Sequence, residues 1–95
     1  MTSDLFAGAS RRQDPDTAKR AARAVEAEEL AVLVTYCLRQ HGPQTAEEIA
    51  DRLGRELGSI TPRLAPLERA GLIARTGERR PGKSGATRIV WESLL

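Results

Sequence analysis

The spacing of hydrophobic residues changes once along this chain, close to residue 72. Upstream, three segments carry apolar residues three and four positions apart, which is typical of helices that pack on one side. Downstream, the segment 87–92 (TRIVWE) alternates between two faces, which is typical of a strand. We therefore expect a mainly α fold that ends in a small β-hairpin, an α+β arrangement.

The first helix is expected over residues 26–41. Its apolar stripe consists of Leu30, Leu33, Val34, Cys37 and Leu38. Acidic residues open this segment and Arg39 lies near its end, which suits the helix dipole. Gly42 and Pro43 are expected to end it.

Two shorter helices are expected to follow. Thr45 and Glu48 form the pattern of a capping box, so a helix should start there and stop at Gly54. The next apolar pattern is made of Leu57, Ile60, Leu64 and Leu67, and Gly71 should end that helix. Pro66 lies inside it, where proline removes one backbone hydrogen bond and bends the helix.

The hairpin is expected to use residues 73–75 and 87–92 as its strands. In the second strand the pattern places Thr87, Ile89 and Trp91 on one side and Arg88, Val90 and Glu92 on the other. Between the strands, residues 77–86 (GERRPGKSGA) combine three glycines, a proline and three basic residues. This composition predicts a polar loop.

The chain's 95 residues fit one domain, which we place at residues 26–95. Residues 14–25 are alanine-rich and predict a helical extension, either separate from the first helix or continuous with it. Residues 1–13 lack apolar periodicity and are expected to be a flexible arm. The sequence shows neither a signal-peptide pattern nor a membrane-spanning run, and its single cysteine suits a reducing cytoplasm, bacterial or that of a host.

Two helices joined by a tight turn and followed by a hairpin predict a winged helix-turn-helix, a three-helix core with a wing. A protruding helix fits the DNA major groove, where each base pair shows a distinct set of donors and acceptors. The outer face expected for the third helix carries no carboxylate; it contains Gly58, Ser59, Pro62, Pro66 and Arg69. We expect Ser59, Thr61 and Arg63 to contact base edges.

The charge distribution points to the same partner. Residues 55–95 hold eight basic and four acidic residues, whereas residues 26–54 hold two basic and six acidic ones. The residues expected to contact phosphates or the minor groove are Thr45, Arg69, Arg75, Arg79, Arg80, Lys83 and Arg88. For Thr45 the competing interpretation is a helix cap and nothing more.

The run from Gly42 to Trp91 resembles winged helix-turn-helix proteins of bacteriophages and prophages. The resemblance lies in Gly-Pro and Thr before Glu-Glu-Ile-Ala, then Ser-Ile-Thr-Pro-Arg-Leu, Leu-Glu-x-Ala-Gly-Leu-Ile, an arginine-rich wing and a closing Val-Trp. The Leu-Glu-x-Ala-Gly-Leu-Ile portion is shared with many winged regulators, including relatives of the multiple-antibiotic-resistance regulator. This resemblance implies double-stranded DNA binding and leaves repression, replication and recombination open; we expect a transcription regulator. Pro66 departs from the pattern of these proteins.

Other classes of function find few residues to support them. Cys37 falls on an apolar stripe and His41 in a helix's last turn, so neither suggests catalysis, a metal site or a cofactor. No small-molecule ligand is evident, and we expect a protein that is not an enzyme. The alternative is a winged-helix module that binds a protein, such as an adaptor or an inhibitor of a host protein. A homodimer through residues 14–25 is compatible with either function.

Overall fold

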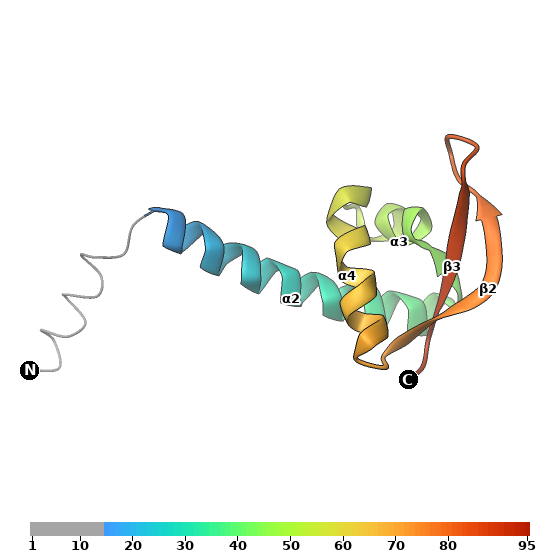
Figure 1. The fold of residues 1–95 in the computed structure, drawn as a ribbon, viewed down its shortest axis with the longest axis horizontal. Helices are drawn as coiled ribbons and strands as arrows, with labels where there is room; N and C mark the ends of the chain where they lie inside the picture. The colour runs from blue at the N-terminus through green and yellow to red at the C-terminus, as the bar shows by residue number, and fades with distance from the viewer. Residues whose placement is uncertain (1–14) are drawn as a thin grey trace, which may run out of the picture.

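The structure is a computed structural model that describes the backbone of residues 15–95 and the side chains from residue 17 onward. Its elements follow the order α2 (Pro15–His41), β1 (Gln44–Thr45), α3 (Ala46–Leu53), α4 (Leu57–Arg69), β2 (Ile73–Pro81) and β3 (Thr87–Ser93). In Figure 1 the long helix α2 runs behind α4, and the hairpin of β2 and β3 stands at the far end of the molecule. This is a winged helix-turn-helix with the expected α+β arrangement.

Helix α2 is one continuous helix of 27 residues, so the alanine-rich segment runs on into the first helix of the domain. Leu30, Val34, Cys37 and Leu38 are buried as expected. Leu33 was predicted to be buried, but this prediction was wrong, because 36% of its surface is exposed at the edge of the stripe. The arm expected at residues 1–13 lies outside the described residues.

Helices α3 and α4 begin and end close to the predicted positions. The capping box is present, since the Thr45 hydroxyl accepts from the Glu48 amide at 3.2 Å and the Thr45 amide donates to the Glu48 carboxylate at 2.8 Å. Gly54 ends α3 with a φ of 66°, a left-handed conformation that glycine adopts without strain. Helix α4 continues through Pro62 and Pro66, which both lie on its exposed side. Water can reach the carbonyl groups that these prolines leave without a donor.

The sheet has three strands in the order β1-β3-β2, one more than the sequence predicted. Strand β1 pairs with β3 through Gln44 opposite Trp91 and Thr45 opposite Val90. This added strand covers part of β3, and Val90, which was expected on the outer side, is fully buried.

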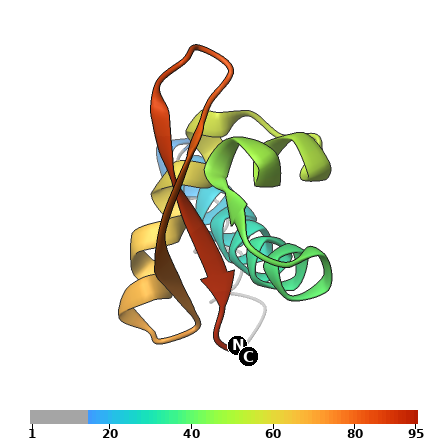
Figure 2. The same ribbon diagram turned by 90° about the vertical axis from the view of Figure 1, so that its right-hand side faces the viewer.

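The predicted loop at residues 77–86 was too long. Strand β2 passes through a bulge between Arg75 and Arg79 and pairs with β3 up to Pro81, opposite Thr87. Gly77 lies in the bulge with a φ of 89°, and its freedom of conformation lets the strand resume beyond the irregularity. We call residues 73–93 the wing; Figure 2 shows its tip projecting beyond the helices.

One hydrophobic core holds these elements together. It contains buried residues of α2, α3, α4 and both ends of the wing, including Trp91 and also Cys37, which lies on the expected apolar stripe. Trp91 therefore anchors β3 against the helices. Within residues 15–95, no helix combines the length and the apolar character needed to cross a membrane.

Candidate nucleic-acid interface

Helix α4 presents one side to the core and the other to solvent. Ile60, Leu64 and Leu67 are buried. The exposed side carries small residues, a hydroxyl, two prolines and an arginine: Gly58, Thr61, Pro62, Ala65, Pro66 and Arg69. The only acidic residue within α4, Glu68, lies at the flank and pairs with Arg75. The exposed side of α4 is thus free of carboxylates, so a polyanion can approach it closely.

The three residues expected to contact base edges do not all lie on the same side of α4. Thr61 is exposed, and its hydroxyl donates to the Leu57 carbonyl oxygen at 3.1 Å. Ser59 and Arg63 are half-buried on the side of α4 that faces α2, where they line a groove of about 210 Å³ with Arg23 and Ala27. The Arg63 Nε is buried and has no hydrogen-bond partner among the described residues.

The cations of the wing tip are paired with carboxylates of α3. Arg80 lies 2.8 Å from the Glu48 carboxylate, and Lys83 lies 2.9 Å from that of Asp51. Arg80 also pairs with Glu78 of its own strand at 3.1 Å. Ion pairs therefore hold the wing against α3. The positive charges of Arg80 and Lys83 are partly neutralised by these carboxylates.

These pairs favour the charged forms of both cations. Hydrogen bonding to Glu78, together with the nearby charge of Glu48, raises the pKa of Arg80 above its usual value, with some opposition from burial. The hydrogen bond to Asp51, supported by the charge of that carboxylate, raises the pKa of Lys83. Both side chains stay partly open to water, so a phosphate can compete with the carboxylates for them.

Glu47 fixes the wing tip to α3 at close range. Its carboxylate accepts from the Lys83 amide at 3.3 Å and lies 3.4 Å from the Arg88 Nε, although that nitrogen lacks the alignment of a hydrogen bond. A Cβ at Gly82 would meet the Glu47 carboxylate, so a larger residue at this position would displace the Glu47 side chain from the wing. Glu48 was expected only in the capping box, and the contacts of Glu47 with the wing were not predicted. Three acids lie close together on α3, Glu47, Glu48 and Asp51, but their clustering does not indicate the wing as their partner.

The seven residues expected at phosphates now fall into three groups. Thr45 is buried and completes the capping box. Four of the cations have carboxylate partners: Arg75, Arg80, Lys83 and Arg88. Arg75 in addition stacks over the Trp91 ring at 5.2 Å, which gives it a structural role. Arg69 and Arg79 are exposed and form no ion pair with any residue from 17 to 95.

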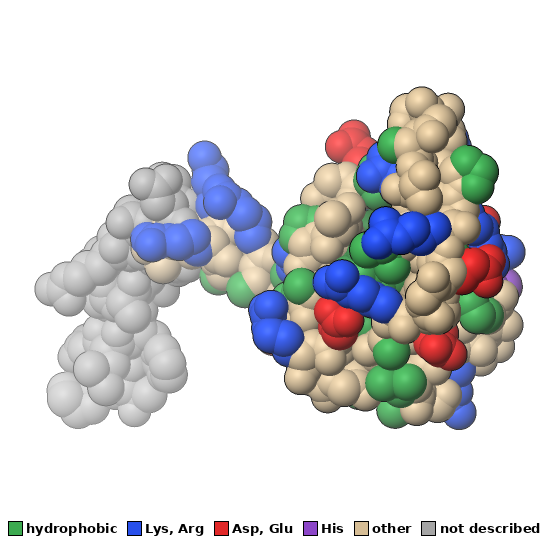
Figure 3. All heavy atoms as spheres, turned by 45° about the vertical axis from the view of Figure 1, so that its right-hand side comes forward, with side chains coloured by type: hydrophobic (Ala, Val, Ile, Leu, Met, Phe, Trp, Pro, Cys, Tyr) green, Lys and Arg blue, Asp and Glu red, His purple; other side chains and the backbone are tan. Residues whose placement is uncertain are grey.

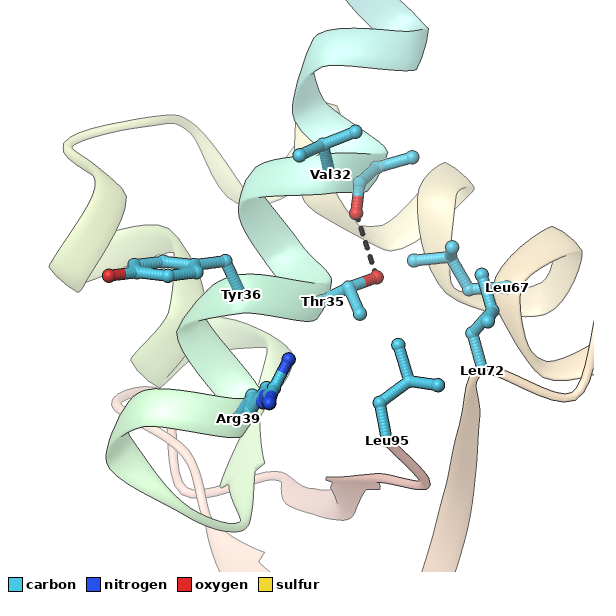
Figure 4. Close-up of a pocket in the computed structure, with 8 residues that line it drawn as sticks. Val32, Thr35, Tyr36, Arg39, Leu67, Leu72 and Leu95 are labelled. Carbon is cyan, nitrogen blue, oxygen red and sulfur yellow. Dashed lines mark hydrogen bonds between the residues drawn. The ribbon is translucent and has the colours of Figure 1, made fainter.

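An apolar groove of about 310 Å³ lies on the other side of α2, and it is lined by residues of α2 that include Val32 and Tyr36, by Leu67 and Leu72, and by Leu95. Figure 4 shows Thr35 of α2 directed toward the three leucines, while the Tyr36 ring extends away from them along the edge of the groove. The Thr35 hydroxyl within it donates to the Ala31 carbonyl oxygen at 2.9 Å, so it offers little polar recognition. Residues 15–95 contain no cluster of three or more acidic, histidine or cysteine side chains placed to bind a metal ion.

Comparisons with known proteins agree with the architecture. The profile of the MarR family matches residues 26–79. Among solved structures, the Zα domain of PKZ from Carassius auratus, crystallised in complex with Z-DNA, superposes with a TM-score of 0.58. It is 20% identical and covers 73% of this chain and 98% of that domain, a likeness that shows the fold alone. None of the curated proteins matches the sequence.

Proposed function

The chain belongs to the MarR family, and on that basis we propose that it binds double-stranded DNA as a transcription regulator. The observation that carries this proposal is the carboxylate-free exposed side of α4 next to a basic wing. A helix of this width fits the major groove, which is about 12 Å wide.

In the proposed complex, α4 enters the major groove and the wing follows the backbone. Thr61 is exposed and contacts a base edge in this arrangement. Ser59 and Arg63 approach the DNA major groove from the side of α4 that faces α2. Arginine binds guanine in bidentate fashion, which is typically worth about 1–3 kcal/mol of discrimination. Arg69 and Arg79 are placed to bind phosphates first, and Arg80, Lys83 and Arg88 join them only by leaving their carboxylates. This arrangement supports sequence-specific or semi-specific binding.

The resemblance to phage and prophage proteins supports a regulator that acts in the cytoplasm of a bacterium, at the nucleoid or on a phage genome. We further propose a homodimer, because one motif covers few base pairs and paired half-sites are the common remedy. Residues 14–25, first considered for this contact, are polar apart from Pro15, the alanines and Val25. Val32 and Tyr36, at 68% and 61% exposure, are better suited to contact a second copy through α2.

The test is the affinity for a duplex of random sequence, measured by fluorescence anisotropy between about 50 and 200 mM salt. Arg69 and Arg79 alone predict a log–log slope of about −2 or steeper, since each neutralised phosphate contributes about −0.9. In a selected duplex, Arg63→Ala should weaken discrimination at one base pair more than affinity for random DNA. Absence of binding at low salt would refute the proposal.

One observation favours a second candidate, a module that binds a protein and not DNA. The wing cations are neutralised by α3, as expected of a wing with a structural task. This candidate predicts weak or no duplex binding, with a slope near zero. The same titration therefore separates the two functions.

A further inference from the structure

The first part of helix α2 extends beyond the domain. Residues 17–25, which we call the α2 overhang, are all exposed, whereas α2 from Leu30 onward contributes to the core. In Figure 3, Lys and Arg side chains gather on the described part of the helix that protrudes from the body. This segment was predicted to be a helical extension and a dimer contact, without a role for its cations.

Helical periodicity places the three cations of the overhang on one side. At 100° per residue, Lys19, Arg20 and Arg23 lie within about 100° of the helix circumference. The same arc continues into Ala27 and Leu30, and both of these line the groove against α4. Arg23 itself lines that groove together with Ser59. The cationic side of the overhang thus faces the same way as the surface of α2 that packs on the beginning of α4.

No acidic side chain of residues 17–95 forms an ion pair with these cations. The overhang, residues 17–25, contains no Asp or Glu, although Asp16 precedes it in the sequence and Glu26 lines the same groove as Arg23. The next residue, Glu26, already lies 3.7 Å from Arg55. Lys19, Arg20 and Arg23 form no ion pair with the described residues, in contrast to the cations of the wing tip.

We propose that the α2 overhang binds the phosphate backbone of the duplex on which α4 is seated, next to the bases that α4 contacts. This inference rests on the proposed function and deepens it, because it names a second contact with the same DNA. Nine helical residues span about 13 Å, which corresponds to about four base pairs along the duplex. The overhang therefore extends the footprint by that length on the side of α2.

The experiment compares two variants that each lower the charge of α2 by two units. Arg20→Ala/Arg23→Ala changes the overhang, and alanine preserves its helix. Gln40→Glu/His41→Glu changes the last turn of the same helix, where both residues are exposed and neither lines the groove of Val32 and Tyr36. Circular dichroism verifies the fold of both, and titration of a random-sequence duplex against salt gives the affinity and the slope.

The overhang variant is expected to bind about tenfold more weakly at low salt, with a slope smaller in magnitude by about 1.8, because two phosphate contacts are lost. The affinity of the control variant for the duplex should stay within about twofold of that of the unmodified chain, because no phosphate contact is removed. Equal affinity and slope for the overhang variant and the unmodified chain would overturn this inference and leave the proposed function intact. A lower mass of the overhang variant in sedimentation equilibrium would also overturn it, since the overhang would then join two copies. An unmodified chain that does not bind DNA would overturn both.

Discussion

The wing tip and the α2 overhang each carry three clustered cations, but they differ in the groups that surround those cations. Arg80, Lys83 and Arg88 face three carboxylates of α3 at distances of 2.8–3.4 Å. Lys19, Arg20 and Arg23 of the overhang form no ion pair with residues 17–95, although Asp16 and Glu26 flank the overhang in the sequence. The difference teaches that the number of basic residues in a segment does not measure the positive charge that it offers to DNA.

The physical reason lies in competition. A cation that is paired within the chain must leave its carboxylate before it binds a phosphate, and the carboxylate left behind then repels the duplex. An unpaired cation loses only water and counterions, whose release favours binding. Arg80, Lys83 and Arg88 of the wing must therefore leave α3 before they bind DNA, while Arg79, the overhang and the exposed side of α4 are available at once.

The largest expected effect comes from placing an acid on the exposed side of α4. Thr61→Glu should reduce affinity for duplex DNA about hundredfold or more, because an unpaired carboxylate against phosphates costs about 3 kcal/mol. Thr61→Gln has the same length without the charge and should lose far less. Anisotropy titrations at one salt concentration compare the two. Equal losses of affinity for both variants would mean that the shape of the α4 surface, and not its lack of a carboxylate, determines DNA binding.

A second, smaller effect is expected when the wing is released from α3. Glu48→Gln/Asp51→Asn removes the α3 partners of Arg80 and Lys83, while Arg80 keeps its pair with Glu78, and glutamine still supports the capping box. Lys83 then becomes available and Arg80 only in part, so the salt slope should steepen by about 0.9 or more and affinity at low salt should rise several-fold.

The control for this change is Glu29→Gln/Glu92→Gln, which removes two carboxylates that form no ion pair with the described residues. It should alter affinity much less, because no cation is released. If both double variants gain affinity equally, the change in net charge explains the effect. Pairing with α3 would then not distinguish the wing cations from those of the overhang.

A third prediction compares two cations of the wing. Arg79 is exposed and has no ion pair with residues 17–95, whereas Lys83 pairs with Asp51. Arg79→Ala should reduce the salt slope by about 0.9, as expected for one lost phosphate contact, and Lys83→Ala by clearly less. The reverse order would show that the α3 carboxylates do not hold the wing cations when DNA is present.

The smallest effect on DNA binding is expected at Thr45. Thr45→Ala removes the cap of α3 and should cost about 1 kcal/mol of stability, which lowers the Tm by about 4–8 °C. Thr45→Ser keeps the cap and should retain most of the stability. Differential scanning calorimetry gives the Tm, and the DNA affinity of the folded protein should stay unchanged. A loss of affinity without a loss of stability would instead make Thr45 a phosphate contact.

The fold could be predicted from the sequence because its signals are local. Stripes such as Ile60, Leu64 and Leu67 and stops such as Gly54 need only neighbouring residues to be recognised. Strand β1 was missed because two residues carry no period of their own and acquire strand structure only by pairing with Trp91 and Val90 of β3. The length of β2 was missed because Gly77 and Pro81 resemble loop residues until the register with β3 is known.

The site was harder to predict because its electrostatics depend on pairs that are distant in sequence. The contacts of Arg80 with Glu48 and of Lys83 with Asp51 each join positions 32 residues apart. Nothing local indicates that the wing tip folds onto α3. Likewise, the side of α4 that faces α2 became known only from the crossing of the two helices, which places Ser59 and Arg63 in a groove beside Arg23.

The most direct test of DNA binding at α4 and the overhang is an NMR titration of the ¹⁵N-labelled chain with a duplex. We expect the largest amide shift changes at Gly58, Ser59 and Thr61 and in residues 19–23, with little change at Val32, Tyr36 and Leu95. Shift changes confined to the groove of Val32, Tyr36 and Leu95, or none at all, would contradict the account.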